Sequence, residues 1–376
     1  MTAKNADKTS DASYWRRIPG LPLWSLALPF VALLTLALAW GRPLNLGLGL
    51  VEAAVLFLAV LTAIHHAEVV AHRIGEPFGT LVLALAVTAI EVALIVSLML
   101  AGGKGADTLA RDTVFASVMI VCNGIVGLCL VAGGLRHGVL AFRVEGTSPA
   151  LASLAALVGL TLVLPSFTTT TPGPTYSGSQ LAFAGIASLA LYGVFVFVQT
   201  VRHRDYFLPA AVEGKAEDAH APPPPSAVAW TSFGLLLLSL VGVVGLAKAL
   251  APALEAGVAA IGAPHSAAGV VIALIVLLPE TGAALRAALG NRMQSSLNLA
   301  LGSGLAGIGL TIPTVAALSP LFPFPLALGL PPSSIVLLAL SLIVGTLTLG
   351  SGRATVMQGA VHLVLLAAFL FLAAVP

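Results

Sequence analysis

Two acidic residues lie inside long apolar stretches of this 376-residue sequence, one in each half of the chain. Glu91 stands in LVLALAVTAIEVALIVSLML, and Glu280 stands in GVVIALIVLLPETGAALRAAL. A carboxylate in hydrocarbon is energetically costly, so it is retained where it faces a protein-lined cavity and a partner. The pair therefore predicts a cation or proton site between two halves of a membrane protein, with Glu91 and Glu280 as the metal ligands.

Neutral oxygen donors accompany the two acids. Thr88 precedes Glu91 by three residues, so both side chains share one face of a helix. Asn123 in MIVCNGIVG and Ser303 in LGSGLAG stand beside glycines that allow close helix approach, and we expect both in the site. Asn298 is a supporting candidate. The alternative for these residues is tight helix packing, and Glu91 itself could be a protonated carboxyl that bonds a neighbouring helix.

Pro279 directly precedes Glu280 and has no backbone N–H to donate. We expect it to break the helix and to free carbonyl oxygens that a hard cation accepts as ligands. In the alternative interpretation, Pro279 begins a short interfacial helix with Glu280 in its first turn.

A second polar group ends the stretch HHAEVVAHRIGEP. His65, Glu68 and His72 are spaced three and four apart, which predicts one stripe on a helix surface. Histidine titrates near neutral pH, so the stripe is a candidate proton path or pH sensor. A solvated helix end is an equally good interpretation. Glu76 is expected to cap the next helix at its N-terminus, where the helix dipole favours negative charge.

The composition excludes a soluble protein. Hydrophobic residues make up 58% of the chain, charged residues make up 9%, and the mean hydropathy is +1.04. A soluble domain has about a quarter charged residues, and the strict alternation of β-barrel strands is missing. Cys122 and Cys129 share one apolar run and imply no disulfide framework. The sequence predicts an all-α polytopic membrane protein.

Apolar runs of about 20 residues mark the membrane-spanning helices. We expect about eleven of them, at 21–40, 46–70, 78–101, 113–133, 149–166, 180–200, 229–250, 266–287, 295–317, 333–350 and 355–375. Ala37 and Ala39 resemble a signal-peptidase site, but the run is longer than a signal-peptide core, so we expect an uncleaved first span. With the N-terminus inside, most of the 17 Lys and Arg residues fall on the inner side, as the positive-inside rule requires.

One long polar connection, RHRDYFLPAAVEGKAEDAHAPPPPS, divides the chain. Its charged and then Pro-rich composition predicts a cytoplasmic linker at 201–228. The linker separates a first five-helix repeat (46–200) from a second (229–376), after a cytoplasmic tail (1–20) and an extra transmembrane helix (21–45). Because five is odd, the two halves must insert with opposite orientation, which is typical of inverted-repeat transporters.

The same motifs resemble a known family. The stretch GEPFGTLVLALAVTAIEVALI and, after the linker, LLPETGAALRAALGNRMQSSLNLALGSGLAGIGLTIP look like the ChaA-type bacterial calcium/proton antiporters of the cation/calcium exchanger superfamily. The resemblance spans essentially all ten repeat helices. In that superfamily each half contributes an acidic residue that holds the cation and exchanges it for protons, which implies these roles for Glu91 and Glu280.

We therefore expect a secondary transporter, not an enzyme, that exports Ca²⁺ in exchange for H⁺ by alternating access. Desolvation and mutual repulsion favour protonated carboxyls when no cation is bound, and a divalent cation would displace both protons. If only one carboxylate binds the ion, a monovalent cation fits better. A Na⁺(K⁺)/H⁺ antiporter for alkaline or salt tolerance thus stays an alternative, followed by an integral-membrane enzyme or sensor built on the histidine stripe.

The remaining expectations concern partners and location. The sequence has no phosphate-binding Gly-rich loop and no soluble domain for a nucleotide. We expect no cofactor besides the transported ions, no nucleotide and no nucleic acid. The expected location is the lipid bilayer of a bacterial inner membrane, with the N-terminus cytoplasmic and the C-terminus periplasmic. The sequence leaves the oligomeric state open.

Overall fold

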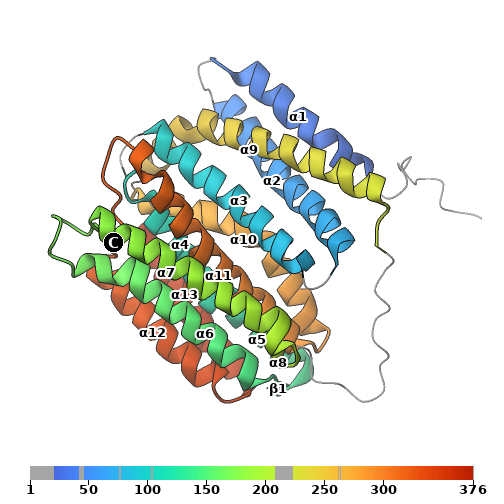
Figure 1. Ribbon diagram of the computed structural model, residues 1–376, viewed down its shortest axis with the longest axis vertical. Coiled ribbons are helices and arrows are strands. Elements are labelled where there is room, and N and C mark those ends of the chain that lie inside the picture. Colours follow the sequence, from blue (N-terminus) through green and yellow to red (C-terminus); the bar gives the residue numbers. More distant parts are fainter. Residues whose placement is uncertain are drawn as a thin grey trace, which may run out of the picture.

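A computed structural model describes residues 21–41, 46–75, 78–102, 105–207, 223–260, 262 and 264–375 of the protein. This part of the chain folds as a helical bundle (Figure 1), and ten of its helical stretches are long and apolar enough to cross a membrane. The predicted all-α polytopic fold is confirmed. The predicted tail lies outside the described residues, and the limits of the linker and repeats stay predictions.

The bundle is built from ten main helical stretches and one shorter helix that precedes them. The first helix and first half comprise α1 (Leu23–Ala39), α2 (Leu46–Ile74), α3 (Phe78–Ala101), α4 (Leu109–Met119), α5 (Val126–His137), α6 (Val144–Val158), α7 (Gly178–Phe197) and the short α8 (Arg204–Phe207). The second half comprises α9 (Ser226–Ala260), α10 (Ser266–Leu289), α11 (Met293–Leu318), α12 (Pro332–Leu349) and α13 (Val356–Ala374).

Three membrane-length stretches contain π-helical turns. The turn η1 (Ile120–Ile125) joins α4 to α5, η2 (Gly159–Val163) extends α6, and η4 (Val198–Arg202) extends α7. Single π-turns add a residue to a helix and are common at functional sites. The stretch from α4 to α5 is almost wholly buried, so it forms the centre of the bundle.

The two halves pack against each other in a reciprocal pattern. The helix α2 lies along α9, and these are the first helices of the two predicted repeats. The third stretch of each half packs on the fifth of the other, because α11 contacts α7 while α5 contacts α13. Figure 1 shows α2, α3, α9 and α10 on one side of the bundle and α6, α7, α12 and α13 on the other.

Two short backbone pairings join the halves at opposite ends of the bundle. At one end, β1 (Leu140–Ala141) pairs antiparallel with β2 (Arg353–Ala354). At the other, Thr175 forms a bridge with Ala327. In each case the loop between the third and fourth stretch of one half meets the loop between the fourth and fifth of the other. This exchange is what two inverted repeats require.

The end that contains β1 and β2 is rich in basic side chains, and we call it the basic end. Arg143 and Arg292 directly precede α6 and α11 there, and Arg204 is the first residue of α8. Across this end, the ring Nε2 of His137 is hydrogen-bonded with the Leu289 carbonyl at 2.9 Å. The opposite end contains Arg111 beside Asp112, with a nitrogen–oxygen distance of 2.8 Å.

The helix α1 has 17 residues, fewer than the ten longer stretches. It packs against α2 and α9. His66 Nε2 on α2 is hydrogen-bonded with the Ser25 carbonyl at 2.9 Å, and the ring of Trp24 lies 4.8 Å from that of His65. A Cβ on Gly242 of α9 would lie 2.9 Å from the Ala32 side chain. The expected extra helix is therefore an integral part of the bundle.

Candidate cation-binding site

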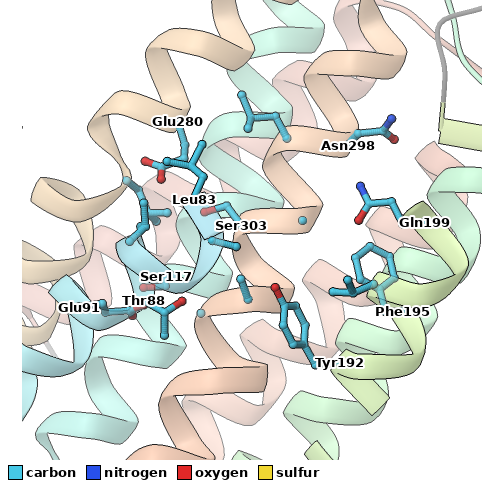
Figure 2. Close-up of a pocket in the computed structure, with 18 of the residues that line it drawn as sticks. Leu83, Thr88, Glu91, Ser117, Tyr192, Phe195, Gln199, Glu280, Asn298 and Ser303 are labelled. Atoms are coloured by element: carbon cyan, nitrogen blue, oxygen red, sulfur yellow. The ribbon is translucent and has the colours of Figure 1, made fainter. Parts of the chain in front are cut away.

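A cavity of about 440 Å³ lies between α3, α7, α10 and α11 (Figure 2). Glu91 and Glu280 both line it, so the structure brings together the two acids that come from different halves of the chain. Three of the neutral candidates, Thr88, Ser303 and Asn298, line the same cavity. Oxygen donors of this kind suit hard cations and protons.

Glu91 is buried in the middle of α3, with 4% of its surface exposed. One carboxylate oxygen, Oε2, accepts a hydrogen bond of 3.3 Å from the Thr311 hydroxyl on α11. The other, Oε1, is buried and has no partner at hydrogen-bond distance among the described residues, and the Ser117 hydroxyl is the neighbouring polar group that interacts with the carboxylate. A Cβ on Gly307 would stand 3.5 Å from Oε2, so glycine leaves space beside the carboxylate. Glu91 thus keeps one oxygen available to a proton or cation.

Glu280 projects from α10 into the same cavity (Figure 2). Its Oε2 atom is buried without a hydrogen-bond partner in the described part of the chain. Its carboxyl interacts electrostatically with Glu91 and Glu68. Both acids therefore have an unpartnered buried oxygen, which is unfavourable unless a proton or cation occupies the site.

Pro279 lies inside α10, which continues from Ser266 to Leu289. The expected helix break is wrong, and so is the alternative of a short helix that begins at Pro279. A transmembrane helix tolerates proline because neighbouring helices compensate for the lost bond. Proline still cannot donate to the carbonyl of Ile275 four residues earlier. One backbone oxygen, not a broken helix, is what this proline frees.

The cavity extends from Glu91 toward the basic end. The residues lining that portion come from η4, α8 and the first turns of α11: Gln199, Thr200, Phe207, Ser295 and Asn298. Beyond Glu91 in the other direction, the side chains of Ile95, Met99, Ile308 and Ile312 are fully buried. The cavity that contains the two acids therefore runs toward the basic end.

Asn123 lies elsewhere and does not line the cavity. Its Nδ2 atom donates to the Ser341 hydroxyl at 2.7 Å, and its Oδ1 atom lies 3.2 Å from His362 Nδ1. The other ring nitrogen of His362 lies 3.1 Å from the Thr348 hydroxyl. Asn123 thus connects η1 with α12 and α13. The structure does not bring this predicted ligand to Glu91 or Glu280.

The histidine stripe on α2 is also outside the cavity lining. His65 is half-buried and contacts the rings of Trp24 and His66, whereas Glu68 and His72 are exposed. Of these three residues, Glu68 interacts electrostatically with Glu280 of the site. Glu68 also interacts electrostatically with Arg286. Glu76 lies outside the described residues.

Two further residues belong to the site, although the sequence alone did not assign them to it. Ser117 on α4 is 6% exposed and lines it, and Thr311 bonds Glu91 directly. Ser303, Gly307 and Thr311 are spaced four apart, and this i, i+4, i+8 pattern on α11 was the available signal. Within the described residues, no cluster of three or more His, Cys, Asp or Glu side chains could hold a metal ion.

Comparison with known proteins identifies the family. A family model described as sodium/calcium exchanger protein matches residues 44–201 and 231–375. The putative ionic transporter y4hA of Sinorhizobium fredii is 48% identical over 364 residues, covering 95% of this chain and 97% of that protein. The sodium-potassium/proton antiporter ChaA of Escherichia coli is 34% identical and covers 92% of this chain and 94% of ChaA.

Solved structures share the fold. The H⁺/Ca²⁺ exchanger CAX matches with a TM-score of 0.71 at 16% identity, over 93% of this chain and 87% of CAX. Native YfkE matches with a TM-score of 0.68 at 16% identity, over 94% of this chain and 99% of YfkE. The matched family consists of secondary transporters, not enzymes. The chain is therefore a multi-pass membrane protein that belongs to the sodium/calcium exchanger family.

Proposed function

We propose that the protein is a secondary cation/proton antiporter that exports Ca²⁺ from a bacterial cell in exchange for H⁺. The observation that carries this proposal is the shared cavity, in which Glu91 and Glu280 from opposite halves each keep an unpartnered buried oxygen. Two carboxylates match the charge of a divalent cation. Hydroxyls from Thr88, Ser117 and Ser303 supply further oxygen ligands of the kind that Ca²⁺ accepts.

Coupling would follow from competition for the same two carboxylates. When a divalent cation binds, both protons leave, and when protons bind, the cation is released. Either state keeps the buried site close to electroneutral, which avoids the cost of an uncompensated charge in a low-dielectric interior. In alternating access, the protein then changes conformation so that the site is exposed first to one side of the membrane and then to the other.

We propose that the basic end is cytoplasmic, and this orientation decides which side of the membrane the cavity faces. Its basic side chains fit the rule that Lys and Arg collect on the cytoplasmic side. In this orientation the cavity is open inward, with the N-terminus cytoplasmic, the C-terminus periplasmic and the protein in the inner membrane. Cytoplasmic Ca²⁺ would enter along Asn298 and Ser303 to reach Glu280 and then Glu91.

A second candidate is exchange of Na⁺ or K⁺ for H⁺. It is favoured by the name of the relative ChaA, a sodium-potassium/proton antiporter that is 34% identical to this chain. One hydrogen bond supports this candidate. The Thr311 hydroxyl donates to one oxygen of Glu91, which makes that carboxylate less available to a cation. If Glu280 alone holds the cation, one negative charge suits a monovalent ion.

The test uses inverted membrane vesicles that contain the full-length protein. Proton exchange is followed by acridine-orange dequenching after addition of CaCl₂, NaCl or KCl, and ⁴⁵Ca uptake is measured in parallel. Glu91→Gln and Glu280→Gln should each abolish exchange while the protein stays in the membrane. Glu145→Gln is the matched control, because Glu145 is an exposed residue on α6 outside the cavity lining.

The outcomes separate the candidates. Dequenching with CaCl₂ that both cavity variants lose supports Ca²⁺/H⁺ antiport. Dequenching with NaCl or KCl alone, lost in the same variants, supports the second candidate. Exchange at the parental rate in both cavity variants would defeat the paired-glutamate site altogether.

A further inference from the structure

The short helix α8 forms part of the cavity wall at the basic end. The Phe207 side chain at its last position is 8% exposed and lines the cavity. Its ring packs edge-to-face on Phe195 of α7, with centroids 6.0 Å apart and planes at 85°. Since the cavity reaches the basic end between η4, α8 and α11, Phe207 stands beside the path from that end to the acids.

Two amide side chains on α11 hold α8 in this position, and we call Gln294 and Asn298 the amide clamp. Asn298 Nδ2 donates to the Phe207 carbonyl, and Gln294 Nε2 donates to the Tyr206 carbonyl at 3.4 Å. Gln294 Nε2 also donates to Asn298 Oδ1 at 2.9 Å, which orients the second amide. Gln294 is 3% exposed. The clamp therefore satisfies carbonyls that the end of a helix leaves without partners.

The helix α6 supports α8 from the other side. Arg143 Nη1 donates to the Asp205 carbonyl at 2.6 Å, and the Arg143 backbone N–H donates to Gln294 Oε1 at 2.7 Å. A Cβ on Gly146 would lie 2.5 Å from the Tyr206 carbonyl oxygen, so only glycine lets α8 come this close. Three successive carbonyls of α8 are thus bound by side chains from two helices of different halves.

We propose that Gln294 and Asn298 are positioning residues for ion exchange. They fix Phe207 beside the cavity mouth and thereby set how readily a cation from the basic end reaches Glu280 and Glu91. The proposal rests on the proposed transport function for its physiological meaning. Access to the cavity, which the clamp is proposed to control, can be measured in the absence of transport.

The experiment measures access to a cysteine placed in the cavity. Ser303→Cys is introduced into the full-length protein in lipid nanodiscs, which expose both faces, and reacted with a positively charged methanethiosulfonate. The native Cys122 and Cys129 are buried, so the parent protein gives the background. Gln294→Met removes the amide and keeps the side-chain volume. Gly146→Ala displaces α8 from the α6 side.

Both variants should raise the labelling rate at position 303 about tenfold, because each displaces α8 from the cavity mouth: Gln294→Met removes the hydrogen bond to the Tyr206 carbonyl, and the methyl group of Gly146→Ala clashes with the same carbonyl. Gly159→Ala is the matched control at the end of the same helical stretch, where an added Cβ would meet no atom within 4 Å, and should leave the rate unchanged. Faster labelling at Cys122 and Cys129 as well would indicate general loosening and overturn the proposal. Parental rates at position 303 in both variants would also overturn it.

The two proposals can fail separately. If Gln294→Met and Gly146→Ala raise labelling but no cation drives proton movement in vesicles, the clamp stands and the antiporter assignment falls. If vesicles exchange cations for protons but labelling is unchanged, the transporter assignment stands and the clamp falls.

Discussion

Thr311 on α11 donates a hydrogen bond to Glu91 on α3, with 3.3 Å between the two oxygen atoms. This bond joins the acidic residue of the first half to the second half of the chain. It occupies one carboxylate oxygen and leaves the other without a partner among the described residues. The hydroxyl therefore orients Glu91 while keeping it available to an ion.

Removing the Thr311 hydroxyl should weaken cation binding. Thr311→Val keeps the side-chain shape but frees the second oxygen of Glu91, and a hydrogen bond to a charged group contributes about 1.5–3 kcal/mol. We expect the apparent KM for the cation to rise roughly tenfold or more in the vesicle assay. Thr314→Val is the control, because its hydroxyl is exposed and bonds the Leu310 carbonyl of its own helix. Equal KM values for the two variants would contradict the orienting role.

The contact between α7 and α11 depends on Gly309. A Cβ at this position would lie 2.8 Å from Cβ of Tyr192, closer than side-chain atoms normally approach. Gly309→Ala must push the helices apart, and overpacking of this kind costs about 1–3 kcal/mol. A lower melting temperature of the purified protein should report it. Gly302→Ala, on the same helix with no atom within 4 Å of its added Cβ, should melt like the parent. A parental melting temperature for Gly309→Ala would show that this contact can relax.

Asn123 should matter for stability and not for ion binding. Asn123→Leu leaves the Ser341 hydroxyl and His362 Nδ1 without their buried partner, and each unsatisfied group costs about 1–3 kcal/mol. We expect a lower melting temperature with an unchanged KM in the folded fraction. A raised KM at unchanged stability would instead return Asn123 to the cation site.

The acids were predictable from sequence because so few explanations exist for a charged group in an apolar run. Glu91 and Glu280 needed only that argument and the division of the chain into halves. The long helices were predictable for a similar reason, since about 20 apolar residues match the thickness of a bilayer.

The neutral ligands were harder to predict from the sequence, because the rotation of each helix about its axis decides which side chains face the cavity. Asn123 sits inside the π-turn η1, where an extra residue changes which side chains share a face with those of α4. The turn directs Asn123 toward α12 and α13, while Ser117 six residues earlier lines the cavity. The expected helix break at Pro279 is wrong because the rule that proline breaks a helix considers only the local sequence. In α10, packing by neighbouring helices keeps the helix continuous through the proline.

The β1–β2 pairing and the Thr175–Ala327 bridge tether loops of the two halves at both faces of the protein. Among the described helices, α2, α3, α9 and α10 adjoin neither tether. Neither pairing involves the loops next to these four helices, whereas the two pairings join the loops that flank α6 and α12. The helices α3 and α10, which carry Glu91 and Glu280, are among these four, so a movement of them in the proposed transport cycle would carry both acids and leave the two pairings intact.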